Sequence, residues 1–383
     1  VTFSSRPRYS DQSVYMMTSA ERMDVSRELV DRKMYYSEVS QWSGYEEALQ
    51  KYYSGAIGYD EFKQLSDYYA NQNTDWFSLL TRDAISHNHS ASISGGSQNI
   101  RYYASLGYTA ETGTIKGDDL KRYTASMNIT ARYKKFNSSF SINANTSSHD
   151  YLPAELGIMD YAYNMSRTIP AYNEDGSLFY YPRRTSGVAS VSPYQFNILN
   201  EMANCGVNTT TDAINLQAQL RYDLLPCLNL QATLAYGITN SNTDTYRTKD
   251  TYYVFQLRAD QTLRNDLCPV GGEMQKSYNR TNNYTARIQA NFIKDFGKHL
   301  INASAGCEAI SNETKSYNIT RRGYFTEYGG YYDYVPTDYS GYYNMWMQSR
   351  AALGTNSRLL NNQLAWYLAG GYSWNDIYTI NLH

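Results

Sequence analysis

Polar and apolar side chains alternate along much of the chain. In residues 121–133 the apolar side chains occupy the odd positions, from Tyr123 to Tyr133, and polar side chains fill the even positions between them. Because successive side chains of a β-strand point to opposite faces, this pattern predicts a strand with one apolar and one polar face. The same pattern predicts ten strands, at residues 88–96, 99–108, 121–133, 137–147, 213–224, 228–237, 283–292, 300–309, 363–374 and 377–383.

The connections between these strands alternate strictly between short and long. The strands at 88–96 and 99–108 are joined by about two residues, whereas the gap before the next strand spans 109–120. The longest gaps are 148–212, 238–282 and 310–362. In an up-and-down antiparallel sheet, alternate connections lie at opposite ends, so one end carries tight turns and the other carries long loops. Outer-membrane barrels have this layout, with the long loops outside the cell.

Strand length distinguishes a membrane barrel from a soluble sandwich. A sandwich gives the same alternation, but its strands average only about 5–6 residues. The predicted strands are about twice as long, which suits the roughly 9–11 residues of a tilted bilayer crossing. Their polar face carries Asn, Gln, Ser and Thr rather than Lys and Glu, as expected for a wet or plugged lumen. We therefore predict an all-β fold, an antiparallel up-and-down transmembrane β-barrel.

Aromatic residues near the ends of the apolar faces predict two interfacial girdles. The girdle at the long-loop end comprises Tyr108, Tyr123, Tyr236 and Tyr284, and the girdle at the short-turn end comprises Tyr133, Phe292, Trp374 and Tyr378.

Residues 1–87 follow a different pattern. Thr18-Ser19-Ala20-Glu21 resembles a capping box and starts a helical pattern, and residues 44–70 contain a second helical stretch. We interpret residues 1–87 as a barrel-strand remnant plus a helical loop insertion, and residues 88–383 as a partial transmembrane β-barrel with long extracellular loops. A separate small domain is the alternative for residues 1–87.

Composition narrows the class of protein. Charged residues make up 18% of the 383 residues and the net charge is -2, which gives no reason to expect a nucleic-acid partner. The 41 Tyr residues make the chain too aromatic for a disordered tail. No run of about 18 apolar residues occurs, which excludes a membrane-spanning helix but leaves transmembrane strands open.

The chain shows no catalytic constellation. It lacks G-x-S-x-G and the phosphate-binding G-x-x-x-x-G-K-[ST], and none of its five His residues has a Ser or Cys partner at motif spacing. The four Cys residues form no C-x-x-C, so a zinc site is not indicated, and their even number leaves disulfides and free thiols both open. We expect a protein that is not an enzyme and that has neither a metal nor a cofactor.

An ordered set of motifs resembles a known family. The motifs are Asn73-Thr74-Asp75-Trp76, SASISGGSQNIRYYASLGY at 90–108, ETGTIKGDDLKRYTASMNITARYKKF at 111–136 and IPAYNEDGSLFYY at 169–181. In this order they resemble the SusC/RagA-like TonB-dependent transporters of Bacteroidetes outer membranes, and the resemblance extends over nearly the whole chain.

The resemblance implies a 22-stranded barrel in the cell outer membrane, with an N-terminal plug and lipid around the wall. It implies import of large nutrients, oligosaccharide or peptide, together with a SusD-like surface lipoprotein and driven by the TonB complex. The plug, the TonB box, the signal peptide and about half the strands have no counterpart here. Because the chain starts at Val1 and stops at His383 inside a predicted strand, we expect a fragment of a longer protein.

Two sets of residues are candidates for contact with a solute. The segment 321–348 is rich in aromatic rings, which stack on sugar faces or peptide side chains. Docking of the lid protein and packing of the rings on each other are the alternatives. The substrate-binding candidates in this segment are Tyr324, Tyr328, Tyr331, Tyr332, Tyr334, Tyr342 and Trp346.

The second set consists of cations on the polar parity of their strands, which face the lumen of a barrel. Its members are Arg101, Arg132, Arg221 and Arg287. They serve either contact with the plug, which we favour, or contact with an anionic solute. Two other functions stay open at the level of the sequence: a passive outer-membrane porin, and a secreted all-β carbohydrate-binding protein.

Overall fold

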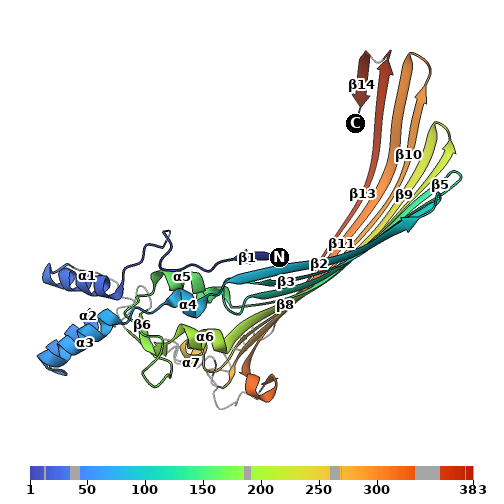
Figure 1. Ribbon diagram of the computed structural model, residues 1–383. Coiled ribbons are helices and arrows are strands. Elements are labelled where there is room, and N and C mark those ends of the chain that lie inside the picture. Colours follow the sequence, from blue (N-terminus) through green and yellow to red (C-terminus); the bar gives the residue numbers. More distant parts are fainter. Residues whose placement is uncertain are drawn as a thin grey trace.

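The computed structural model describes residues 1–12, 14–34, 44–184, 191–258, 268, 270–332, 354–375 and 377–382. Within these residues, the chain forms one large curved antiparallel sheet, with helices gathered at one end of it (Figure 1). The strands of this sheet are β1 (Thr2–Ser4), β2 (Ala84–Gly96), β3 (Ile100–Thr112), β4 (Asp119–Tyr133), β5 (Phe136–Tyr151), β8 (Cys205–Leu225), β9 (Leu228–Arg247), β10 (Gly272–Asp295), β11 (His299–Phe325), β12 (Tyr331–Tyr332), β13 (Thr355–Trp374) and β14 (Tyr378–Leu382).

The strand order confirms the predicted up-and-down topology. Neighbours along the chain are neighbours in the sheet, in the order β1-β2-β3-β4-β5-β8-β9-β10-β11-β13-β14, with β12 paired to β11. All ten predicted strands are present, and several extend well beyond their predicted ends on the side of the long loops. The hairpin of β6 (Tyr181–Arg184) and β7 (Val191–Phe196) forms a separate two-stranded sheet in one of these loops.

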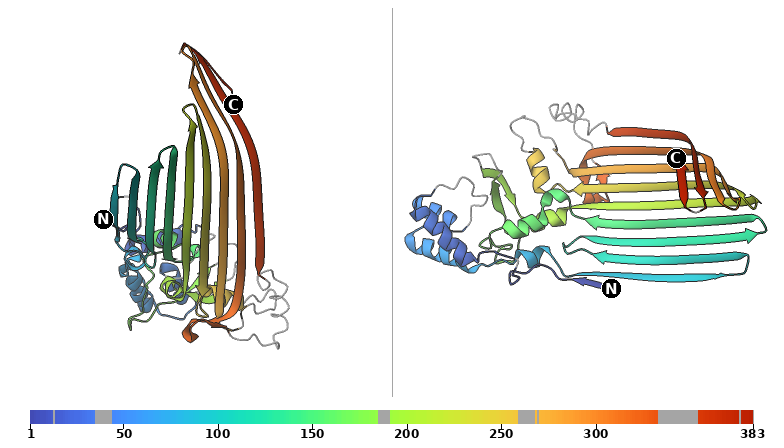
Figure 2. Two further views of the ribbon diagram at one scale, coloured as in Figure 1. Left: turned by 90° about the vertical axis from the view of Figure 1, so that its right-hand side faces the viewer. Right: turned by 90° about the horizontal axis from the view of Figure 1, so that it is seen from above.

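Short turns and long connections lie at opposite ends of the strands, as predicted. The view from above in Figure 2 shows the tight turns at one end and all the helices at the other. The helices and 3-10 turns are α1 (Ser19–Asp31), α2 (Tyr45–Tyr53), α3 (Tyr59–Asn71), α4 (Trp76–Leu80), η1 (Ala154–Leu156), α5 (Ile158–Asn164), α6 (Ile198–Asn204), α7 (Tyr252–Arg258) and η2 (Thr326–Tyr328). Among the described residues, none of these helices is long and apolar enough to cross a membrane.

The predicted capping box at the start of α1 is present. The backbone N–H of Glu21 donates to Thr18 Oγ1 at 3.3 Å, and the backbone N–H of Thr18 donates to a Glu21 carboxylate oxygen at 2.8 Å. Two of the orphan donors at the helix N-terminus are therefore satisfied reciprocally. This helix lies with α2 and α3 in a bundle at the far end of the loop region (Figure 1).

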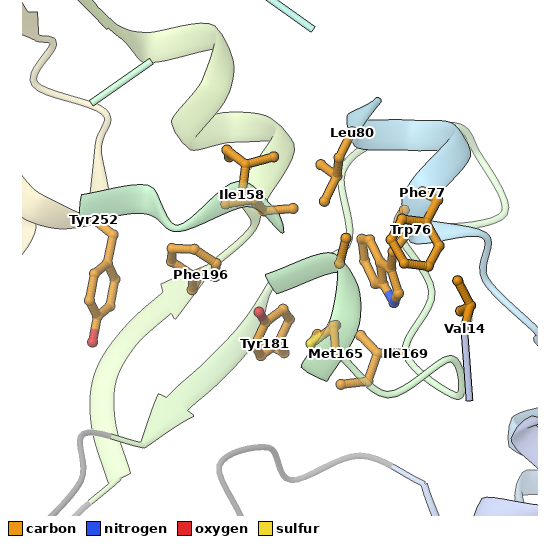
Figure 3. Packing of buried hydrophobic residues seen from close by; sticks show 13 residues of the cluster. Val14, Trp76, Phe77, Leu80, Ile158, Met165, Ile169, Tyr181, Phe196 and Tyr252 are labelled. Carbon is orange, nitrogen blue, oxygen red and sulfur yellow. The ribbon is translucent and has the colours of Figure 1, made fainter. Parts of the chain in front are cut away.

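The long connections fold together around a hydrophobic core of their own. Trp76, Phe77 and Leu80 of α4 are buried in one cluster with Ile158 of α5 (Figure 3). Ile198 of α6 belongs to the same cluster. The other core members are Val14, Ala162, Met165, Ile169, Ala171, Tyr181, Phe196 and Tyr252. We call this set the loop core. Each large side chain buried in it contributes about 1.5–3 kcal/mol, so the long connections form one packed layer at this end of the sheet.

The Asn73–Trp76 motif joins two segments of this layer. Thr74 Oγ1 donates to the carbonyl of Ile169 at 2.6 Å, and the indole N–H of Trp76 donates to the carbonyl of Ser166 at 3.1 Å. Asp75 caps α4 by accepting from the backbone N–H of Ser78 at 2.8 Å. The motif thereby fastens the N-terminal helices to the connection that follows β5.

Candidate functional site

The register of the sheet puts apolar and polar side chains on separate faces. One row of paired residues crosses eight strands on the apolar face: Tyr102, Ile129, Phe140, Ala218, Leu234, Ala286, Ala309 and Leu364. The adjacent row on the opposite face reads Arg101, Thr130, Ser139, Gln219, Thr233, Arg287, Glu308 and Ala365. Large apolar side chains such as Leu234, Ile288 and Trp366 lie exposed on the first face. A face of this kind requires lipid or another apolar partner.

The girdle residues contact each other across neighbouring strands. The rings of Tyr108 and Tyr123 lie 4.9 Å apart between centroids, and those of Tyr236 and Tyr284 also lie 4.9 Å apart. At the turn end, Trp374 stacks on Tyr378 at 5.9 Å. Each predicted girdle therefore contains aromatic pairs in contact on the apolar face.

The girdles also reveal how the strands are inclined to the membrane. Following the register from Tyr123 leads to Arg280 on β10, yet the girdle residue there is Tyr284, closer to the turns. This shift of four residues is about 13 Å along the strand over about 19 Å across four strand spacings, which gives an angle of about 35°. From Tyr133 to Trp374 the shift is six residues over six spacings, again about 35°.

This angle matches the tilt of about 35–45° in outer-membrane barrels. On β4 the two girdles are ten residues apart, from Tyr123 to Tyr133. With that tilt, the spacing corresponds to about 27 Å along the membrane normal, close to the apolar band of about 25 Å in such barrels. The apolar face therefore has the dimensions of a membrane-facing barrel wall.

Three of the four predicted arginines line one hollow on the polar face. Arg101, Arg132 and Arg221 border a hollow of about 440 Å³ near the short turns. The other polar residues around it include Gln98, Asn99, Thr130, Asn137, Ser139, Gln219 and Gln231. These amides, hydroxyls and guanidinium groups can hold carboxylate or amide groups by hydrogen bonds.

The partners of these arginines differ. Arg221 Nε donates to Asp223 at 2.8 Å, and Arg287 donates to both carboxylate oxygens of Glu308, at 3.0 and 2.9 Å. In the part of the chain that the structure describes, the side chains of Arg101 and Arg132 form no hydrogen bond or ion pair. Two exposed cations of the hollow are thus available to another segment or a solute.

A buried ion network, which the sequence did not reveal, lies at the loop end of the same face. Glu273 is only 1% exposed and accepts from Arg322 Nε at 2.9 Å, from Arg247 Nη1 at 3.4 Å and from Tyr253 Oη at 3.1 Å. Arg247 also donates from its Nε to Glu155 at 3.0 Å. We call these five residues the Glu273 network.

The network joins the barrel wall to the long connections. Arg247, Glu273 and Arg322 are register partners on β9, β10 and β11, whereas Glu155 comes from η1 and Tyr253 from α7. Burial alone would lower the pKa of Arg247, but the hydrogen bonds and charges of its carboxylate partners raise that pKa above its ordinary value. Burial raises the pKa of Tyr253 to about 12. Arg247 therefore keeps its charge and Tyr253 its proton near neutral pH, and the network acts as a clamp.

The aromatic segment is only partly within the described residues. Tyr324 lies near the end of β11, two residues after Arg322 of the Glu273 network; Tyr328 lies in η2, and Tyr331 and Tyr332 form β12, which pairs with β11. Tyr334, Tyr342 and Trp346 lie outside the described residues. The segment thus begins directly above the polar face at the loop end.

Three other hollows lie on the opposite face. Hollows of about 630, 570 and 450 Å³ are lined mainly by apolar side chains such as Leu106, Leu234 and Ile93. They are grooves between the exposed residues of the apolar face rather than solute sites of a lumen.

Comparison with known proteins places this geometry in a context. No protein-family model matches the chain. The chain is 27% identical over 256 residues to the TonB-dependent receptor SusC of Bacteroides thetaiotaomicron, covering 62% of this chain and 24% of that protein. It is 23% identical over 337 residues to the TonB-dependent receptor P3 of Formosa agariphila, covering 79% of this chain and 31% of that protein. The chain therefore spans less than a third of the length of these relatives.

Solved structures share the fold. The RagAB peptide importer in its open-open state matches 99% of this chain with a TM-score of 0.69, and the closed-closed state matches it with 0.68. Sequence identity is 17% in both cases, and the match covers 40% of those chains. The open sheet is thus part of an outer-membrane β-barrel, with the apolar face toward lipid and the polar face toward the lumen.

Proposed function

From the premise that this chain is part of an outer-membrane barrel similar to the SusC- and RagA-like TonB-dependent receptors, we propose that the full-length protein imports large nutrients. The observation that carries this proposal is the polar face. Amides, hydroxyls and arginines follow one another in register along the inside of the wall, beneath a folded layer of loops at its outer end. A polar lumen below a structured mouth suits the passage of hydrogen-bonding solutes.

Oligosaccharide or peptide is the proposed substrate class. Tyr324 follows Arg322 of the Glu273 network by two residues on β11, Tyr328 lies in η2, and Tyr331 and Tyr332 pair with the end of β11. Tyrosine rings offer apolar area with a hydroxyl handle, which suits sugar faces and peptide side chains alike. Tyr334, Tyr342 and Trp346 are proposed to belong to the same contact surface.

A surface lipoprotein like SusD and the TonB complex are the proposed partners. RagAB is described as a peptide importer, and 99% of this chain matches 40% of a RagAB chain. We propose that a lipoprotein covers the loop layer and that the TonB complex supplies energy through a part of the protein outside this chain.

We propose that the arginine hollow receives the plug. Arg101 and Arg132 are exposed, carry no partner among the described residues and lie close to the short turns, where a lumen-filling domain is expected. Contact with carboxylates of such a domain gives both cations the partners they lack. Arg287, already held by Glu308, serves to stiffen the wall.

The import proposal is tested in a strain from which the full-length gene is deleted. Growth on single oligosaccharides or peptides as the only nutrient is compared before and after complementation with the full-length gene. We expect growth on at least one nutrient to depend on the gene and to stop when the proton gradient is dissipated. Equal growth of both strains on every nutrient would contradict import, and gene-dependent growth without the gradient would indicate a passive porin.

A further inference from the structure

A row of cations crosses the lipid-facing side of the wall above the outer girdle. Arg280 on β10 is paired in register with Lys315 on β11, which is paired with Arg358 on β13. Their parity is that of the apolar face, because Tyr284 lies four residues from Arg280 on the same strand. The three side chains therefore point out of the barrel, not into it.

The height of this row corresponds to the lipid headgroups. Four residues separate Arg280 from the girdle residue Tyr284, which is about 13 Å along the strand and about 11 Å along the membrane normal at a tilt of about 35°. Long basic side chains at this height reach the polar surface of the bilayer while their stems lie on the wall. Arg280 and Lys315 thus lie just outside the apolar band, and Arg358 lies farther out on the tilted wall.

The row holds more positive than negative charge. Glu313, 17% exposed, accepts from Arg358 Nε at 2.6 Å and pairs with Lys315 Nζ at 3.2 Å. Within the described residues, Arg280 has neither a hydrogen bond nor an ion pair. The next cation outward, Lys276, is neutralised by Asp244 at 2.7 Å. These three cations therefore share one carboxylate, and the four side chains together carry a net charge of about +2. Asp212 of the same row lies two strands away on β8, where it accepts from Thr146.

An apolar groove lies on the same face of the wall, closer to the short turns than the cations. A hollow of about 570 Å³ is lined by Leu234, Tyr236, Tyr284, Ala286 and Ala309, among others. The small side chains on β10 and β11 leave this hollow between the larger residues on either side. A molecule that fills both features has an anionic head at the level of Arg280 and hydrocarbon chains along the wall below.

We propose that this surface binds a phosphorylated glycolipid of the outer leaflet, with its phosphate groups on Arg280, Lys315 and Arg358 and an acyl chain in the groove. Guanidinium groups pair with phosphate through two parallel hydrogen bonds, which favours phosphate over a diffuse negative surface. A free anion would gain nothing from the groove, and a protein partner would have to enter the lipid to reach it. The proposal rests on the outer-membrane location of the barrel and not on the import function.

The test uses the full-length protein purified in detergent micelles. A bisphosphorylated diglucosamine lipid is titrated into the micelles, and bound lipid is counted by native mass spectrometry. The same lipid without phosphates and inorganic phosphate in excess are the comparison probes. The variant is R280Q with K315Q and R358Q, and the matched control removes three exposed cations of the helical insertion, R27Q with R32Q and K51Q.

We expect the wild type and the control to bind the phosphorylated lipid equally. Each cation near a membrane surface strengthens binding by about fivefold, so the triple variant is expected to lose at least about tenfold in affinity, with Glu313 offsetting part of the change. Removal of the phosphates from the lipid is expected to cost the wild type a similar factor. Equal binding by wild type and triple variant would overturn the proposal, as would displacement of the lipid by inorganic phosphate.

A second variant keeps the test decisive if the triple variant does not fold. The single substitution R280Q removes a cation that has no partner in the wall, so it breaks no ion pair. It is expected to weaken lipid binding by about fivefold while the folded barrel migrates as the wild type does on a gel without heating. Unchanged lipid binding by this folded variant would count against the proposal.

Discussion

Removal of the charge of Glu273 should release the loop layer from the wall without unfolding the barrel. The substitution Glu273→Gln keeps the shape of the side chain but leaves two guanidinium groups, those of Arg247 and Arg322, beside a neutral amide. Both guanidinium groups are largely buried, so water replaces the lost carboxylate poorly. The hydroxyl of Tyr253 on α7 loses its charged acceptor at the same time.

The structure gives a magnitude for this release. Removal of one partner from a buried ion pair costs about 3–5 kcal/mol. Because Glu155 still accepts from Arg247, we expect the lower end of the range, about 3 kcal/mol. That free energy corresponds to about a hundredfold rise in the population in which residues 248–258 are open.

Hydrogen exchange of the full-length protein, followed by mass spectrometry, measures this opening directly. Amides of residues 248–258 should exchange about a hundredfold faster in the variant, whereas those of β8 and β9 should not change. The matched control is Glu327→Gln, because Glu327 pairs with Lys249 at 2.9 Å but both side chains are about 40% exposed. An exposed pair of this kind contributes about 0–1 kcal/mol, less than about fivefold. Equal exchange in both variants would refute the role assigned to the Glu273 network.

Three further predictions concern the loop core, the buried thiols and the lipid-facing wall. Trp76→Ala should destabilise the loop core by about 3–5 kcal/mol, seen as trypsin cleavage of the N-terminal helices while the barrel still resists heat on a gel. Burial raises the pKa of Cys205 to about 12 and that of Cys268 to about 11, so fewer than about one thiol in a hundred is ionised at pH 8. Iodoacetamide should therefore label these two residues only after unfolding. The labelling rate of the unfolded protein should rise about tenfold per pH unit below the ordinary pKa of a thiol. Labelling of the native protein within minutes would contradict this. Leu230→Arg, on the lipid face, should cost about 2–4 kcal/mol in a urea titration of the refolded barrel, whereas Asn229→Arg, one residue along on the lumen face and opposite Asp223, should cost about 1 kcal/mol or less.

The alternating pattern predicts the membrane-spanning part of each strand well because lipid lies on one face only. It fails beyond the girdles. On β9, residues 239–245 are all polar, and β11 continues past its predicted end at 309 to Phe325. Where both faces of a strand meet water, no periodic hydrophobic signal remains. The first nine strands were therefore predicted at the correct places but too short, mainly on the side of the long loops.

The candidate site likewise contains residues that the strand pattern predicts and residues that it does not. The parity of Arg101, Arg132 and Arg221 follows from the strand pattern, and the register brings the three to one hollow. The Glu273 network has no local signature, because Glu155 and Arg322 are separated in sequence by β8, β9 and β10. Only the register between β9, β10 and β11 brings the charged residues of these three strands together. Register is a property of pairs of strands rather than of one segment.

The membrane-spanning part of each strand sets the register of the part that extends beyond the membrane. A slip of one residue between β10 and β11 would turn Ala286 and Ile288 toward the lumen and polar residues toward lipid, at a high cost. No such cost applies where both faces are wet, and pairs such as Thr281 with Thr314 at 3.3 Å add only modest hydrogen bonds. The pairing of Glu273 with Arg322 lies eleven residues, about 36 Å, beyond Tyr284 along β10. The alternation that meets the membrane therefore sets the position of the clamp that holds the loop layer, far outside the membrane itself.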